Sequence, residues 1–178
     1  MHTSIFLLFL FTISLHNTEE GIWLIQMTMD SKMQRHKAIT QDQFLFAVIA
    51  VTAAAYFITA MFLFYPQNSI VKYAYFGFLA IMMLNVIFPH LLLTIVEKKY
   101  SPGLMTGLSL IIPIHTIMII RSIQYRFISI SGLLLGTIIM ALCILLLIPV
   151  MFKLASKLIN STVHVMFNEK CLISTQIL

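Results

Sequence analysis

Four long apolar segments separated by short polar stretches dominate the chain. They cover residues 44–64, 73–96, 104–120 and 127–152. An α-helix rises about 1.5 Å per residue, so about twenty residues cross a hydrocarbon core about 30 Å thick. Each segment is therefore predicted to form a membrane-spanning helix, and the third is the shortest of the four.

A fifth apolar run, residues 5–15, ends in the polar sequence His16-Asn17-Thr18-Glu19-Glu20. A secretory signal peptide is one interpretation, but the first four residues carry no lysine or arginine, and no small-x-small cleavage site follows the run. We expect instead a first helix over residues 3–20, followed by an interfacial segment around Trp23. The pattern thus predicts an all-α, polytopic transmembrane bundle of about five helices, forming a single domain over residues 1–178.

The composition supports a lipid environment. Of the 178 residues, 60% are hydrophobic and 10% are charged, whereas soluble domains are about 45–50% apolar and about 25% charged. This excludes an ordinary soluble globular protein, and the short connections leave no room for a soluble catalytic domain. The 11 Lys and Arg residues outnumber the 6 Asp and Glu residues, but they lie between the apolar runs. We therefore interpret them as topology signals and expect no nucleic-acid partner.

The basic residues orient the predicted bundle. Taken over alternate connections, eight fall on one side (Lys32, Arg35, Lys37, Lys98, Lys99, Lys153, Lys157 and Lys170) and three on the other (Lys72, Arg121 and Arg126). The side richer in Lys and Arg is predicted to be cytoplasmic. The N-terminus is then outside, the C-terminus is inside, and the connection over residues 30–43 faces the cytoplasm.

Ionisable residues within these segments are candidates for function. His16, Glu19 and Glu20 follow i, i+3, i+4 spacing, which places them on one helix face. Such groups cost about 2.5–3.5 kcal/mol each at membrane depth, so they face a bundle interior or a wet cavity. In the third predicted helix, His90 lies about 9 Å before the end of the apolar segment, a depth comparable to that of His16. We expect these two helices to be neighbours, with His16 or Glu20 near His90.

The sequence His16-Asn17-Thr18-Glu19-Glu20 resembles the signature of the HXXEE-motif family of small, largely bacterial integral membrane proteins of unestablished function. The family's later block is similar in order and spacing to the stretch from Asn85 to His90, to Tyr100-Ser101-Pro102-Gly103-Leu104-Met105-Thr106 and to Pro113. The resemblance covers about residues 15–121. It implies a multi-pass protein of the bacterial cytoplasmic membrane and supplies no reaction.

The chemistry of these groups leaves several functions open. Imidazole and carboxylate ligands suit Zn, Fe or Mn, so His16, Glu20 and His90 are candidate ligands of a divalent metal ion. Glu19 is the alternative carboxylate ligand, and whichever of Glu19 and Glu20 does not bind metal is a candidate base or partner of an imidazole. An acid–base enzyme that uses Glu19 and Glu20 on a lipid-soluble substrate, a proton or ion pathway, and a structural cluster are the other hypotheses. Membrane lipid is the expected partner, and no oligomeric state is predicted.

Other residues have a structural interpretation. His115 is expected to be a hydrogen-bonded core histidine and not a ligand. The glycine pairs Gly103/Gly107 and Gly132/Gly136 allow close helix contact. Kinks are predicted at the prolines within the apolar segments, which are Pro89, Pro113 and Pro149.

The predicted topology can be tested by labelling. In a variant without native cysteines, a cysteine introduced next to Arg35 should react with a membrane-impermeant thiol reagent only from the cytoplasmic side. A cysteine next to Asn68 should react only from outside. The reverse pattern would contradict the predicted orientation.

Overall fold

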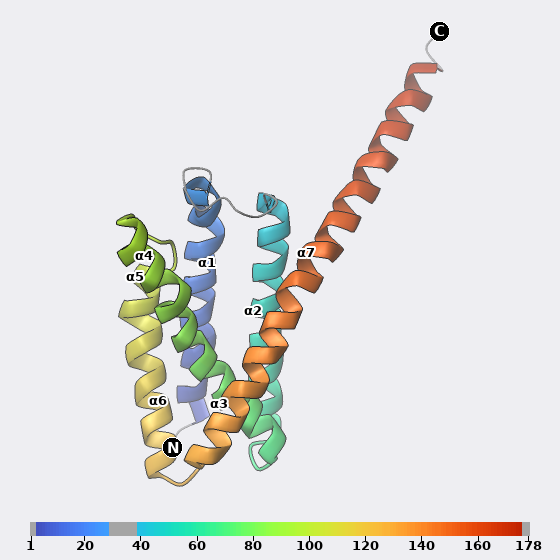
Figure 1. Ribbon diagram of the computed structural model, residues 1–178. Helices are drawn as coiled ribbons and strands as arrows, with labels where there is room; N and C mark the ends of the chain where they lie inside the picture. The colour runs from blue at the N-terminus through green and yellow to red at the C-terminus, as the bar shows by residue number, and fades with distance from the viewer. Residues whose placement is uncertain (1–2, 29–38, 176–178) are drawn as a thin grey trace.

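The computed structural model describes the backbone of residues 3–28 and 39–175, and the side chains of residues 5–22 and 39–159. The connection with Lys32, Arg35 and Lys37, and the side chain of Trp23, lie outside the described residues. The elements are helical (Figure 1): η1 (Thr3–Leu7), α1 (Leu8–Thr28), α2 (Gln41–Phe64), α3 (Ser69–Asn85), η2 (Val86–Leu91), α4 (Leu92–Glu97), α5 (Leu104–Thr106), η3 (Gly107–Ile111), α6 (Ile112–Gln124) and α7 (Ile130–Thr175).

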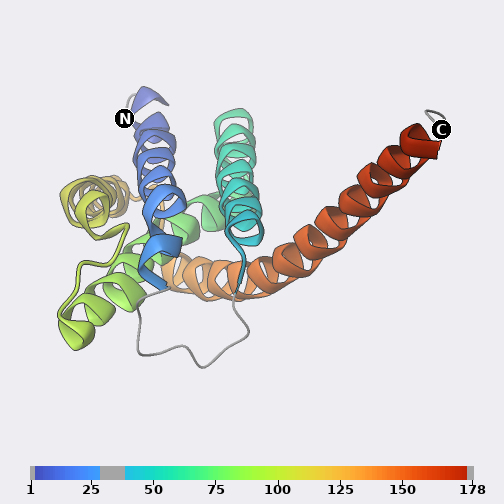
Figure 2. The ribbon, with the colours of Figure 1, turned by 90° about the horizontal axis from the view of Figure 1, so that it is seen from above.

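These elements form a polytopic helical bundle, as the apolar pattern predicts. Within the described residues, four helical stretches are long and apolar enough to cross a membrane: Gln41–Phe64, Ser69–Glu97, Leu104–Gln124 and Ile130–Ile159. The additional helix α1 lies between α2 and the α5–α6 stretch. α1 and α7 are longer than expected, and the C-terminal half of α7 extends away from the other helices (Figures 1 and 2).

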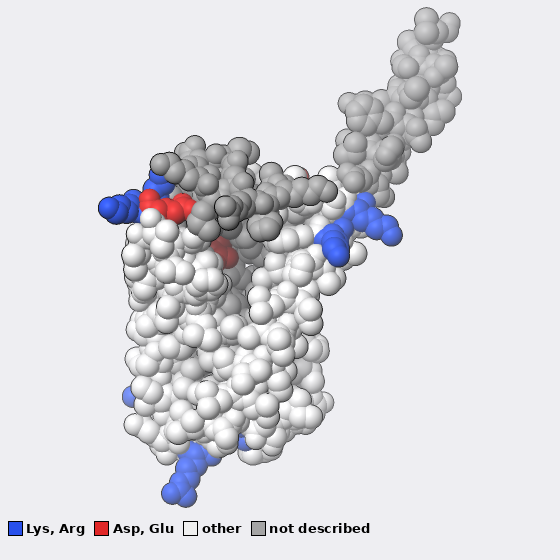
Figure 3. Space-filling view, in the orientation of Figure 1, with Lys and Arg blue, Asp and Glu red and all other residues white. Residues whose placement is uncertain are grey.

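Charged side chains gather at the two ends of the bundle, and the face between them carries almost none (Figure 3). The first turn of α3 holds Lys72 and the connection after α6 holds Arg126 at one end, and the connection after α4 holds Lys98 and Lys99 at the other. An uncharged band between charged ends is the surface that a bilayer requires. Which end faces the cytoplasm stays a prediction.

The face of the first helical segment that enters the bundle follows a regular spacing. Phe6, Phe9, Ile13, His16 and Glu20 are separated alternately by three and four residues, which places them on one helix stripe. Phe9, Ile13 and His16 are fully buried. The stripe is therefore apolar in the half near the N-terminus and ionisable in the other half, so one end of the bundle interior is polar.

Helices α3 and α7 cross at close range because small residues meet there. A Cβ atom added at Gly77 would overlap the backbone of Gly136, and one added at Gly136 would overlap the backbone of Tyr73. The glycine pair Gly132/Gly136 therefore packs against α3 within the same chain. From this crossing the two helices diverge toward the end of the bundle that carries His16 (Figure 1).

Two of the predicted kinks interrupt the membrane helices. Phe88 has extended backbone angles (φ −133°, ψ 110°), as the residue before a proline often does, and the Phe88–Pro89 peptide bond is cis. α3 therefore passes through the π-helical segment η2 before it continues as α4. The π-helical segment η3 likewise precedes Pro113, which lies in the first turn of α6. α7 runs through Pro149 as one helix.

Substitution of Gly136 tests the α3–α7 crossing. Gly136→Leu should lower the free energy of unfolding in detergent by about 1–3 kcal/mol or more, because the added side chain meets backbone atoms that cannot move aside. Thermal unfolding checks this, with Cys143→Leu as the control because Cys143 is exposed on the same helix. Equal melting temperatures for the two variants would contradict the described crossing.

Candidate functional site

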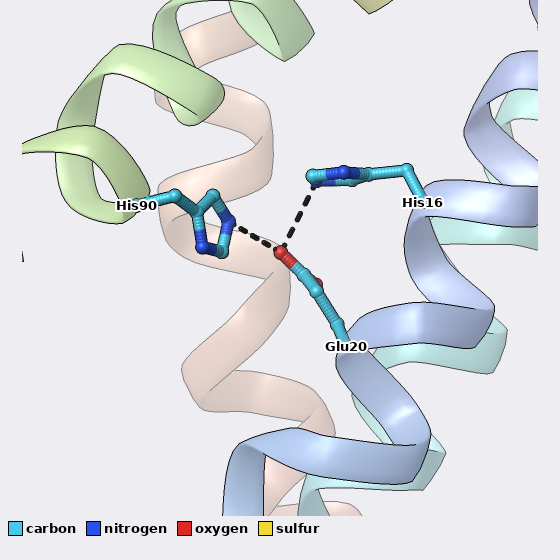
Figure 4. Close-up of side chains that lie close together, drawn as sticks. All are labelled: His16, Glu20 and His90. Carbon is cyan, nitrogen blue, oxygen red and sulfur yellow. Dashed lines mark ion pairs between the residues drawn. The ribbon is translucent and has the colours of Figure 1, made fainter. Parts of the chain in front are cut away.

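Two histidines and one glutamate converge at the polar end of the bundle interior. Oε1 of Glu20 lies 3.2 Å from Nε2 of His16 and 2.6 Å from Nε2 of His90 (Figure 4). One donor atom from each of the three residues lies within 4.8 Å of the other two. His16 is fully buried and His90 is 3% exposed. The predicted proximity of the first and third helices at this level is therefore confirmed. We call these three residues the His/Glu cluster.

The interruption at Pro89 brings His90 into the cluster. On a regular α-helix, Asn85 and His90 would point about 140° apart, because five residues exceed one turn of 3.6. Because the helix is broken at Phe88, Nδ2 of Asn85 instead lies 3.2 Å from Nε2 of His90. The same amide nitrogen lies 3.4 Å from Nε2 of His16 and 3.5 Å from Oε1 of Glu20. Asn85 thus reaches all three members of the cluster.

Each imidazole of the cluster contacts a hydroxyl group on its other nitrogen. Nδ1 of His16 lies 3.2 Å from Oγ1 of Thr106, and Nδ1 of His90 lies 3.3 Å from Oγ of Ser101. Ser101 is itself fixed, because its backbone N–H donates to Thr94 Oγ1. Both rings are therefore held with Nε2 directed at Glu20. Histidines that bind metals are commonly oriented by such a contact on the second nitrogen.

Glu19 has a different set of partners from its neighbour Glu20. Its carboxylate accepts hydrogen bonds from the backbone N–H groups of Gly103 (2.8 Å) and Thr106 (3.0 Å). It also accepts from the Thr106 hydroxyl (2.6 Å) and the Tyr100 hydroxyl. Gly103 precedes α5 and has no side chain to cap it, so Glu19 supplies the cap from α1. Burial and the contact with Glu19 raise the pKa of Tyr100, which keeps this phenol protonated as a donor.

The partners of Glu19 determine which nitrogen of His16 carries hydrogen. A hydroxyl group has one hydrogen, and that of Thr106 is donated to the carboxylate of Glu19, which accepts only. Oγ1 of Thr106 must therefore accept its second hydrogen bond from Nδ1–H of His16. In the neutral imidazole of His16, Nε2 then carries a lone pair directed at Glu20.

The backbone of Gly103 packs directly against both imidazole rings of the cluster. Its φ of +90° favours glycine. A Cβ atom at this position would lie 2.9 Å from Cε1 of His16 and 2.9 Å from Cε1 of His90. The backbone thus approaches both imidazoles more closely than any other residue type allows.

Among the residues whose side chains are described, the third buried histidine, His115, is a hydrogen-bonded core residue, as expected. Nε2 of His115 lies 2.8 Å from Oγ1 of Thr12, and Nδ1 lies 3.1 Å from the carbonyl oxygen of Leu79. His115 is fully buried among apolar residues, and a ring contact with Phe9 covers it. Both ring nitrogens therefore have partners outside the His/Glu cluster.

Sequence reasoning missed the residues that orient the cluster. The sequence assigns no role to Ser101, Gly103 and Thr106 beyond their resemblance to the family's later block, although they contact His90, both imidazoles and His16, respectively. The sequence does carry a signal, because these two hydroxyl residues and this glycine lie close together, between the end of α4 and the end of α5. Their partners depend on the fold of that connection, which local patterns do not define.

Comparison with known proteins identifies a family and a relative of this chain. A family model described as a protein of unknown function with HXXEE motif matches residues 7–118. This range contains the whole His/Glu cluster and the residues that orient it. The uncharacterised protein YrkK of Bacillus subtilis (strain 168) is 42% identical over 149 residues, which cover 84% of this chain and 94% of that protein. No solved structure matches the chain.

Removal of the Thr106 hydroxyl tests the orientation of His16. In protein labelled with ¹⁵N-histidine and treated with chelator, solid-state NMR should find hydrogen on Nδ1 of His16. Thr106→Val should abolish that signature and lower the free energy of unfolding by about 1–3 kcal/mol, because a buried N–H loses its acceptor. Thr106→Ser, which keeps the hydroxyl, is the control. A neutral His16 protonated on Nε2 in the unsubstituted protein would contradict the assignment.

Proposed function

Because the chain belongs to the HXXEE-motif family, for which no reaction is established, we propose its function from the site itself. The protein is a membrane-embedded enzyme that binds one divalent metal ion, Zn, Fe or Mn, through His16, Glu20 and His90. Its substrate is lipid-soluble. The site lies in the cytoplasmic half of a bacterial cytoplasmic membrane.

The observation that carries this proposal is the convergence of two Nε2 atoms on one carboxylate oxygen. The three donor atoms are separated by 2.6 to 4.8 Å, a range that includes the distance of about 3.3 Å between two ligands on a tetrahedral ion with bonds of about 2.0 Å. Imidazole nitrogen and carboxylate oxygen are ligands that these metals accept. The donor set therefore fits the proposed ion.

Electrostatics at His16 also favours a cation. Its Nδ1–H donates to Thr106, so a neutral ring directs the lone pair of Nε2 at Oε1 of Glu20, 3.2 Å away. Two lone pairs at this distance repel each other in a buried site unless a proton or a metal ion lies between them. A divalent cation bound between Nε2 of His16 and Oε1 of Glu20 removes that repulsion.

The chemistry divides between the two glutamates. When bound, the ion would act as a Lewis acid and polarise an oxygen atom of the substrate. Glu20 is the member of the cluster that lines a cavity, so it meets the substrate. Glu19 accepts four hydrogen bonds from Tyr100, Gly103 and Thr106. These bonds support a role for Glu19 in positioning Thr106 and His16, and not as the general base.

A structural cluster is the second candidate, and one observation favours it. The 2.6 Å contact between His90 and Glu20 is a complete charge-assisted hydrogen bond without any metal. With the contact from His16, it joins α1 to the broken helix that carries His90. In this interpretation the cluster holds helices in register and performs no reaction.

Metal analysis of the protein purified in detergent separates the two candidates. The proposal predicts about one equivalent of Zn, Fe or Mn in the unsubstituted protein, and loss of that metal in His16→Ala, Glu20→Gln and His90→Ala. Because the site is arranged for function, these variants should melt near the temperature of the chelator-treated protein. His115→Asn, which removes a buried histidine outside the cluster, is the matched control and should retain metal.

The opposite outcome is equally specific. No bound metal in any sample, together with lower melting temperatures for all three cluster variants, would overturn the metal site and leave a structural cluster. That loss should amount to about 1–3 kcal/mol for each stranded partner.

A further inference from the structure

One cavity reaches the His/Glu cluster from the apolar part of the bundle. It has a volume of about 560 Å³ and lies between α2, the α3–η2 stretch and α7. Figure 3 shows a hollow on the viewed face with an acidic side chain at its depth. Among the three cluster residues, Glu20 lines this cavity. The cavity therefore gives access to the cluster from one side.

The lining of the cavity is amphipathic. Its polar side chains are Asn17, Glu20 and Asn85, all from the end of the bundle that holds the cluster. The walls contributed by α2 and α7 are otherwise apolar, from Phe44 to Val51 and from Ala141 to Phe152. A ligand that matches this lining has one polar end and a hydrocarbon body.

The α3–α7 crossing explains why a cavity exists at this level. The helices touch at Gly77 and Gly136 and diverge from there toward the cluster, and the wall residues of α7 follow that contact point in the chain. Pro89 and Phe88 also line the cavity, so the interruption of α3 shapes the opposite wall. The space is therefore fixed by features of the backbone.

We propose that this cavity binds a single-chain lipid alcohol, with its hydrocarbon chain between α2 and α7 and its hydroxyl group at Glu20 and Asn85. The proposal rests on the proposed function, because it names the class of substrate that reaches the metal ligands. A volume of about 560 Å³ lies within the usual range for small-molecule sites. It accommodates one hydrocarbon chain and not the two chains of a phospholipid.

The charge of the lining selects the polar end of the ligand. Among the described residues that line the cavity, none is a lysine or arginine, the residues that bind phosphate. Without the ion, the carboxylate of Glu20 repels an anionic headgroup, whereas it accepts a hydrogen bond from a hydroxyl group. Asn85 offers an amide donor at the same end. An uncharged alcohol therefore fits, and a phosphate ester does not.

Photo-crosslinking in phosphatidylcholine nanodiscs tests the proposal. The probe is hexadecanol with a diazirine in its chain, and the crosslinked residues are mapped by mass spectrometry. Crosslinks should concentrate on the cavity walls of α2 and α7. In the chelator-treated protein, unlabelled hexadecanol should compete for these crosslinks and hexadecyl phosphate should not. Ala141→Phe, which fills the cavity from α7, should reduce crosslinking by about tenfold, the effect of excluding about two buried methylene groups.

Two further variants keep the result interpretable. Ala60→Phe makes the same change at an exposed position of α2 outside the cavity and should leave crosslinking unchanged. Ile144→Trp fills the cavity from another position and should reproduce the loss if Ala141→Phe does not fold. Metal content is measured on each sample, and both cavity variants should retain their metal.

The outcomes separate the lipid site from the metal site. Crosslinks on the cavity walls in a protein that binds no metal would support the lipid site and overturn the proposed enzyme. Bound metal with crosslinks spread over all lipid-facing helices, or concentrated between two copies of the chain, would overturn the lipid site alone. Equal competition by hexadecyl phosphate would overturn the assignment of an alcohol.

Discussion

The structure depends on one constraint, which is that two adjacent carboxylates within an apolar bundle must each find partners. Glu20 directs its oxygen at two imidazoles, and Glu19 caps the start of α5 through Gly103 and Thr106. An unpaired carboxylate at membrane depth costs several kcal/mol, so each glutamate requires at least one partner in the bundle interior. The position of α1 among the other helices, the break in the helix before His90 and the turn before α5 all supply these partners.

The two carboxylates are also connected to each other. The Thr106 hydroxyl donates to Glu19 and accepts from His16, and His16 contacts Glu20. The cap of α5 thus sets the orientation of an imidazole in the His/Glu cluster. A substitution in the connection that begins at Tyr100 is therefore expected to change the orientation of His16 without contacting Glu20.

Much of this arrangement follows from the sequence. The length and apolarity of the spans predict the bundle, and the matched depths of His16 and His90 predict their convergence with Glu20, because buried ionisable groups require one another. The separate role of Glu19 could not be predicted, since helical spacing places it on the same face as Glu20. The alignment of Asn85 with His90 also depends on the extended backbone at Phe88, which breaks the helix and which a regular helical period does not describe.

The central claim is that the His/Glu cluster binds a divalent metal ion, and X-ray absorption at the metal edge tests it most directly. In the metal-loaded protein, the account predicts a first shell of nitrogen and oxygen at about 2.0–2.2 Å, with the outer-shell scattering of two imidazole rings. The same scattering should be present in His115→Asn, which keeps all three cluster residues. A sulfur shell at about 2.3 Å, or an oxygen shell without imidazole scattering, would contradict it.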